Sequence, residues 1–197
     1  ETLHLTNMYL HGREREASEL LEAFDRATSD GAARDGTTSA SASSGACSNS
    51  NVVVLVTGYS GTGKSTLVRN VGPRFVERGA CFVSGKFDAM QQVQPLSAIA
   101  NALNEYCGLL ARDEVRTGQV KEALAATMGG EGCVLAVLVP NLCEILPQAT
   151  PPDRHPSLAS VATTEAQHLL SHLIRALLHS TCSQAYPLVL FLDDLQW

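Results

Sequence analysis

A glycine-rich turn stands between an apolar run and a helical pattern in the first third of the chain. Residues 52–56 are an unbroken run of valine and leucine, the composition expected of a strand that is buried on both faces. Gly58 to Ser65 then satisfy the pattern G-x-x-x-x-G-K-[ST], and a helical pattern opens at Lys64. Because the pattern lies between a strand and a helix, where it binds phosphate in proteins, the match is strong.

The chemistry of this loop follows from its residue types. Glycines let backbone N–H groups turn inward, and together with the positive end of the next helix they form a cradle for phosphate oxygens. Lys64 would reach the β- and γ-phosphates, and the Ser65 hydroxyl would ligate Mg²⁺. The residues expected to contact the nucleotide are Gly58, Tyr59, Ser60, Gly61, Thr62, Gly63, Lys64, Ser65 and Thr66.

A second apolar run, Leu188 to Leu192, ends in two acids, which is the form of a Walker B strand. Asp193 would hold Mg²⁺, directly or through a water molecule. Asp194 would orient or polarise the attacking water, so Lys64 and Asp194 are the catalytic candidates. Taken alone, the run could equally be a strand that ends in an Asp-Asp turn; the phosphate loop favours the Walker B interpretation.

The absence of guanine-specificity motifs from the sequence indicates which base the nucleotide carries. Guanine specificity needs Asp-x-x-Gly after the second strand and Asn-Lys-x-Asp further on, and the sequence carries neither. Adenine is therefore the expected base, and ATP with Mg²⁺ the expected ligand.

Helical and strand patterns alternate along the rest of the chain. Gly72-Pro73 is expected to stop the helix after the loop, with a second helical stretch reaching Arg78. A short strand at 81–84 completes a strand, helix, strand unit and implies a parallel sheet. Further helices are expected at 17–27, 96–111, 115–128, 135–145 and 163–179.

Residues 31–50 differ from the segments around them. They are mostly Ser, Ala, Gly and Thr and include no Leu, Ile, Val, Met or aromatic residue. Such a segment cannot bury enough apolar surface to offset the entropy of ordering it, so we expect a flexible insertion.

Composition limits the classes of partner. The 197 residues are 45% hydrophobic, enough for a core, and 20 acidic against 14 basic residues give a net charge of −6. We therefore expect neither nucleic acid nor membrane as a partner. No apolar run approaches the about 18 residues that span a bilayer and no signal-peptide pattern is found, which indicates a cytoplasmic location.

Metal-ligand and disulfide patterns are weak. The six cysteines form no C-x-x-C pair and are interpreted as reduced core thiols. His168 and His172 are four residues apart on one expected helix, with His179 two turns further on. Because no nearby Cys or carboxylate completes a ligand set, a solvated or interface face is favoured over a metal site.

With these residues identified, the chain resembles the origin-recognition-like AAA ATPase domain of large signalling proteins, which is close to the STAND class of regulatory ATPases. Such proteins are typically sensor histidine kinases, serine/threonine kinases or adenylate cyclases. The resemblance covers nearly all of the chain except 31–50. It rests on the segments Tyr9-Leu-His-Gly-Arg-Glu14, Val56 to Ser65, Val83-Ser-Gly-Lys-Phe-Asp88, Glu165-Ala-Gln167 and Pro187 to Trp197.

The resemblance implies an α/β P-loop NTPase fold of three αβα layers with a parallel sheet. A large helical insertion would lie between the second strand and the Walker B strand. In similar proteins the Gly-Arg-Glu segment packs beside the adenine, so Gly12 and Arg13 are candidate base contacts, with His11 beside them; a surface charge before a helix is an equal alternative for Arg13. The implied divisions are an N-terminal segment and helix on the adenine side (1–30), the insertion (31–50) and a partial ATPase core (51–197).

Similar proteins continue past the last tryptophan through two more strands and a helical lid. One of those strands lies between the phosphate-loop strand and the Walker B strand. The resemblance therefore implies a core that is incomplete at its C-terminus, and we expect marginal stability and slow or absent hydrolysis from such a piece.

Three functions remain open. The first is an ATP-hydrolysing regulatory module whose nucleotide state acts on flanking kinase or sensor domains. The second is a nucleotide-binding scaffold that holds ATP or ADP with little turnover. The third, a DNA replication initiator, is disfavoured by the acidic charge and the lack of a basic segment.

Overall fold

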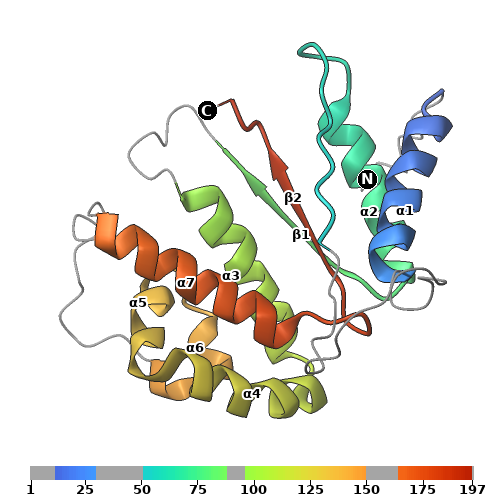
Figure 1. The fold of residues 1–197 in the computed structure, drawn as a ribbon. Coiled ribbons are helices and arrows are strands. Elements are labelled where there is room, and N and C mark those ends of the chain that lie inside the picture. Colours follow the sequence, from blue (N-terminus) through green and yellow to red (C-terminus); the bar gives the residue numbers. More distant parts are fainter. Residues whose placement is uncertain (1–11, 30–50, 88–95, 150–163, 197) are drawn as a thin grey trace, which may run out of the picture. The chain divides into compact units, whose positions relative to one another are not determined.

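The computed structural model describes residues 12–29, 51–87, 96–149 and 164–196, and the chain divides into two compact units, 1–80 and 81–197. Each unit is described by itself (Figure 1). The predicted insertion at 31–50 lies outside the described residues, as do His11, Cys47 and Asp88.

Helices α1 and α2 form the helical part of the first unit in its described residues. Helix α1 (Glu14–Ser29) covers the predicted helix at 17–27, and α2 (Lys64–Glu77) begins at the lysine of the glycine-rich loop. The rings of Phe24 and Phe75 lie 5.3 Å apart between them, and Arg78 binds both carboxylate oxygens of Asp25, at 2.8 and 2.9 Å. An apolar contact and an ion pair therefore hold α1 against α2.

The predicted stop at Gly72-Pro73 is wrong. Helix α2 runs through Pro73 to Glu77 as one element. A proline inside a helix removes one backbone hydrogen bond, a local cost that buried packing can offset. Here Val71, Gly72 and Phe75 are all buried, so tertiary packing holds the helix together across the proline.

The predicted buried strand at 52–56 is also wrong. Residues 51–58 have no regular secondary structure, and Val53 and Leu55 are 92% and 72% exposed. A run of this composition forms a stable strand only when a neighbouring strand pairs with its backbone. In the described part of the chain, β1 and β2 pair only with each other, so this run has no ladder partner there.

The second unit contains a parallel strand pair, as predicted. Strand β1 (Cys81–Lys86) lies beside β2 (Leu188–Asp193), in a register that runs from Cys81 opposite Leu188 to Lys86 opposite Asp193 (Figure 1). Because the strands are parallel and in register, their carboxyl ends lie together.

Between the two strands, the described residues form the α-helices α3 (Ser97–Ala111), α4 (Glu114–Met128), α5 (Gly132–Leu138), α6 (Leu142–Ile145) and α7 (Thr164–Thr181). Short 3₁₀ turns occupy Gly129–Glu131 and Pro147–Ala149. The single helix predicted at 135–145 is instead two, because Val139 precedes a proline and takes an extended conformation with φ −127° and ψ 74°.

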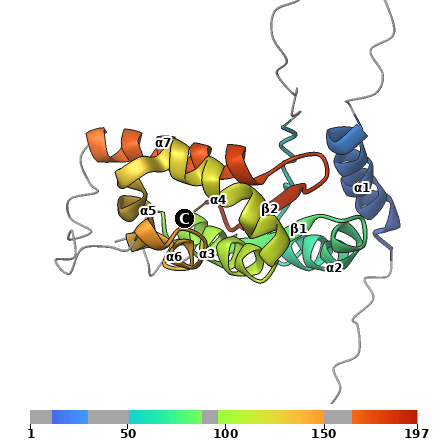
Figure 2. The same ribbon diagram turned by 90° about the horizontal axis from the view of Figure 1, so that it is seen from below.

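The helices build their own apolar core. Helix α4 runs beside α7, α5 packs against α7 and α3, and α6 packs against α3 and α5 (Figure 2). Leucines from five helices are almost fully buried where they meet: Leu103, Leu124, Leu135, Leu142, Leu173 and Leu177. Cys107 joins this core as a free thiol, and burial raises its pKa to about 12. The other described cysteines, Cys81, Cys133, Cys143 and Cys182, are also free thiols but only half-buried, so the predicted core position holds for Cys107 alone.

A buried arginine joins the helices to the start of β2. Arg116 of α4 is 9% exposed, and its Nη2 donates to the Tyr106 hydroxyl at 3.1 Å and to the Thr181 carbonyl at 2.8 Å. Its guanidinium also lies over the ring of Tyr186, 4.5 Å from the centroid. Arg116 thus connects α3, the end of α7 and the turn that leads into β2.

Helix α3 packs on one face of the strand pair at very short range. A Cβ placed on Gly85 would lie 2.2 Å from the carbonyl oxygen of Ala98, which is closer than atoms can approach. Val83, two residues earlier on the same face, is buried against Ala102 and Tyr106 of α3. Only glycine at position 85 allows this approach, and it places Lys86 directly after the contact.

Gly85→Ala should therefore lower the free energy of unfolding of the second unit, by about 1–3 kcal/mol, because β1 and α3 must separate. Gly118→Ala is the matched control, since that glycine lies inside α4 with no atom within 4 Å of an added Cβ. The control should raise stability by about 0.5–1 kcal/mol through helix propensity. Urea denaturation of both variants measures the difference, and an equal response to the two alanines would contradict the close approach.

Candidate functional site

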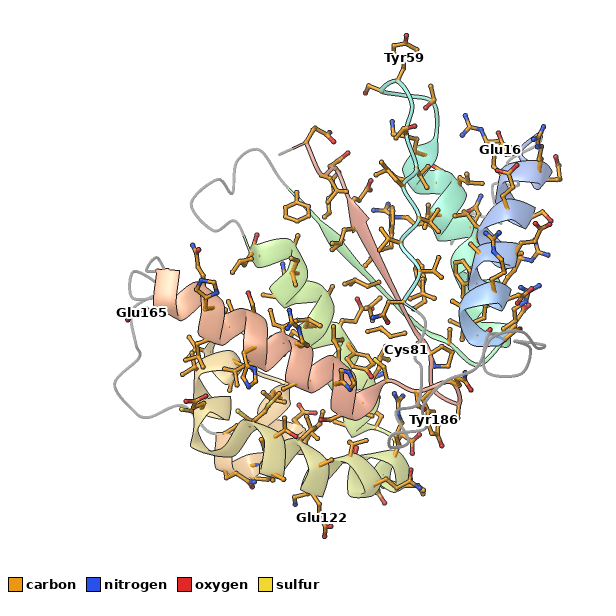
Figure 3. The ribbon with its side chains drawn as sticks, in the orientation of Figure 1. Glu16, Tyr59, Cys81, Glu122, Glu165 and Tyr186 are labelled. Carbon is orange, nitrogen blue, oxygen red and sulfur yellow. The ribbon has the colours of Figure 1, made fainter. Side chains whose placement is uncertain are left out.

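The glycine-rich loop adopts a backbone that favours glycine at three positions. Gly58, Gly61 and Gly63 have φ of 152°, 79° and 80°, in the region that L-amino acids with a side chain rarely adopt. Tyr59 lies at the tip of the loop, 89% exposed, with its side chain directed outward (Figure 3). The Tyr59 side chain therefore does not fill the loop.

Lys64 folds over this loop. Its Nζ donates to the carbonyl oxygens of Gly58 and Tyr59, at 2.8 and 2.9 Å. The Thr62 hydroxyl donates to the same Tyr59 carbonyl at 2.8 Å. These contacts keep the lysine ammonium at the mouth of the loop, where an anion could exchange for the carbonyls.

The loop is narrow at its base. A Cβ on Gly58 would lie 3.3 Å from the Thr62 hydroxyl oxygen and 3.7 Å from Cδ of Lys64. Gly63 caps α2 in a left-handed conformation and, lacking a side chain, makes no side-chain cap hydrogen bond. The positive end of a 14-residue helix therefore opens into the loop through a glycine.

The two residues carried over from the resemblance lie at the start of α1. Gly12 has φ 93°, and the guanidinium of Arg13 donates to the carbonyl of Thr62 in the loop. A groove of about 890 Å³ separates α1 from the loop and the extended run before it. Arg13, Glu16 and Leu20 line it on the helix side, and Val54, Tyr59 and Lys64 on the loop side. Arg13 and the loop thus border one groove of a size typical of ligand sites.

The two acids lie at the carboxyl end of β2 and have different surroundings. Asp193 is 8% exposed, and its carbonyl accepts from the Phe87 amide at 3.1 Å. Asp194 is half-buried and has φ 59°, a left-handed conformation at a residue other than glycine. Its amide donates to Oδ1 of Asp193 at 3.1 Å. The second acid is therefore turned away from the strand by a strained backbone.

Lys86 belongs to the segment Gly-Lys-Phe-Asp, and the sequence alone predicts no role for it. In the structure its Nζ lies 3.3 Å from Oδ2 of Asp194. Its position in the sequence could have indicated this contact. Lys86 and the two acids lie at the ends of expected strands, and a parallel sheet brings such ends together.

The remaining sequence candidates do not gather into a site. His168, His172 and His179 are exposed on α7, in agreement with the predicted solvated face. Within the described ranges, no three metal-binding side chains of His, Cys, Asp or Glu come together. None of the helices that the structure describes is long and apolar enough to cross a bilayer.

The sequence profile of the AAA ATPase domain matches residues 40–197. The chain belongs to this family. The resemblance inferred from the motifs is confirmed, and the parallel strands with surrounding helices agree with an α/β fold of the AAA ATPase type.

This AAA ATPase domain is similar to part of a signalling protein. It is 30% identical over 144 residues to hybrid signal transduction histidine kinase G of Dictyostelium discoideum, which covers 73% of this chain. The match spans 4% of the length of that kinase. A search with this chain finds no matching solved structure.

The strained backbone at Asp194 can be measured. Asp194→Gly should give a protein about 1 kcal/mol more stable than Asp194→Ala, because glycine adopts φ 59° without a Cβ clash. Both variants lose the carboxylate and its contact with Lys86, so the comparison isolates the backbone. Thermal and urea unfolding of the pair provide the test, and equal stabilities would show that the residue is not held in the left-handed region.

Proposed function

We propose that this domain binds ATP with Mg²⁺ and hydrolyses it, as a regulatory module of a multi-domain signalling protein. The glycine-rich loop carries the proposal, because its left-handed glycines, the helix that begins after Gly63 and the overlying Lys64 together suit a polyphosphate. Membership of the AAA ATPase family supports nucleotide use. In this proposal the fold is a P-loop fold of three αβα layers, with helices α3–α7 as the insertion before the Walker B strand.

The residues of the loop would bind the phosphates. Backbone N–H groups from Gly61 to Thr66 would donate to phosphate oxygens, and the Lys64 ammonium would leave its two carbonyl partners for the γ-phosphate. Because those partners are neutral carbonyls, exchange for a charged oxygen is favourable. Arg13 and Gly12, at the edge of the groove beside α1, would contact the adenine side.

The residues at the end of β2 would position the water. The half-buried carboxylate of Asp194 would accept a hydrogen bond from the attacking water and orient it. Ser65 and Asp193 offer a hydroxyl and a carboxylate oxygen, the hard donors that suit Mg²⁺. Bound there, Mg²⁺ would neutralise charge on the β- and γ-phosphates.

The proposal of a regulatory role is supported by the similarity to a histidine kinase. Hybrid signal transduction histidine kinase G is a signalling protein, and the similar segment is a small part of its length. A nucleotide-dependent change in this domain would then bias the arrangement of flanking kinase or sensor domains. We propose a cytoplasmic location and expect neither membrane nor nucleic acid as a partner.

Lys64→Ala should weaken ATP binding by at least about 10-fold, because it removes a charge-assisted hydrogen bond worth about 1.5–3 kcal/mol. Fluorescence titration with a nucleotide analogue measures the affinity. Lys121→Ala, at an exposed position of α4, is the control and should bind like the wild type. Unchanged affinity in Lys64→Ala would refute the loop as the nucleotide site.

Asp194→Asn should reduce ATP turnover by about 10²–10⁴-fold and leave ATP affinity within about two-fold, because only the orientation of water is lost. Steady-state phosphate release and the same titration give the two values. If the wild type binds ATP and releases no phosphate, the nucleotide-binding scaffold is the better description. If Asp194→Asn turns over ATP like the wild type, another group positions the water.

A further inference from the structure

The pair formed by Lys86 and Asp194 links the ends of the two strands. Lys86 is the last residue of β1 and stands opposite Asp193 in the register. Its Nζ reaches past Asp193 to Oδ2 of Asp194, at 3.3 Å. The lysine therefore contacts the acid that has turned out of the strand.

The orientation of the Asp194 carboxylate has few other restraints. Its own backbone lies in the left-handed region, and its Oδ1 accepts a long 3.4 Å hydrogen bond from Gln196, an exposed residue two positions on. Backbone contacts fix the neighbouring Asp193, since its carbonyl accepts from Phe87. Among the contacts described for the Asp194 carboxylate, the one to Lys86 is the ionic one.

Lys86 itself is well placed to fix an orientation. The Gly85 contact with the Ala98 carbonyl holds the end of β1 against α3, so the backbone of Lys86 starts from a rigid point. Its side chain is 61% exposed and that of Asp194 34%, so neither charge is stranded in the core. A pair of this exposure favours one orientation by a factor of up to about five.

We propose that Lys86 is a positioning residue for Asp194: its ammonium holds the carboxylate in the orientation that receives the attacking water. The inference rests on the proposed hydrolysis of ATP and adds a residue to it. Lys86 acts through Asp194 and needs no contact with the nucleotide, so its loss lowers kcat and leaves KM unchanged.

Lys86→Met tests this role, since it keeps the length of the side chain and removes the charge. We expect kcat for ATP to fall about three- to five-fold with KM within about two-fold of the wild type. Lys86→Arg should restore kcat to within about two-fold, because it can reach the same carboxylate. Lys121→Met on α4 is the matched control and should change neither constant.

A double variant separates positioning from a general effect of charge. In an Asp194→Asn background, Lys86→Met should change kcat by less than about 1.5-fold, because the group that it positions is already gone. A full additional three- to five-fold fall in the double variant would overturn the proposal. So would a wild-type kcat in Lys86→Met.

The outcomes also distinguish this inference from the proposed function. Turnover that is lost in Asp194→Asn and unchanged in Lys86→Met overturns the positioning role alone. A wild type without turnover overturns both hydrolysis and positioning. Circular dichroism and the unfolding midpoint of each variant establish that it is folded, and Lys86→Gln replaces Lys86→Met if the latter is not.

Discussion

The in-register parallel pairing of β1 with β2 determines the chemistry at the end of this sheet. It sets Lys86 opposite Asp193 and so brings a cation beside two acids that are more than one hundred residues away in the sequence. The close contact of Gly85 with α3 fixes one side of that end, and the left-handed backbone of Asp194 fixes the other. A one-residue shift of the register would turn these side chains to the opposite face.

The sequence predicted most helices and the two strands that find a pairing partner. The strands expected at 81–84 and 188–192 are present, because each has the other as a parallel neighbour. The apolar run at 52–56 forms no strand, because pairing depends on a partner that composition does not reveal. Pro73 and Pro140 show the same limit: one lies within a helix held by buried packing, and the other separates two helices.

The sequence predicts the candidate site best where the conformation of the backbone requires a particular residue type. The loop from Gly58 to Ser65 is specified by glycines, whose conformational need is written in the residue type, and the structure gives three of them left-handed φ values. Lys86 could not be assigned a role, because an exposed lysine after a strand is common and its partner is set by register. Arg116 was missed for a related reason, since its three partners come from separate parts of the chain.

The way in which Arg116 is held affects how the second unit responds to acid. The contacts described for its guanidinium are a phenol, a backbone carbonyl and an aromatic ring, and none of these gains a proton in the acid range. A buried cation paired with a carboxylate would lose its partner when that carboxylate is neutralised. The connection between α4, the end of α7 and the entry to β2 is therefore insensitive to acidification, whereas the Lys86–Asp194 contact at the other end of the same strand depends on an ionised acid.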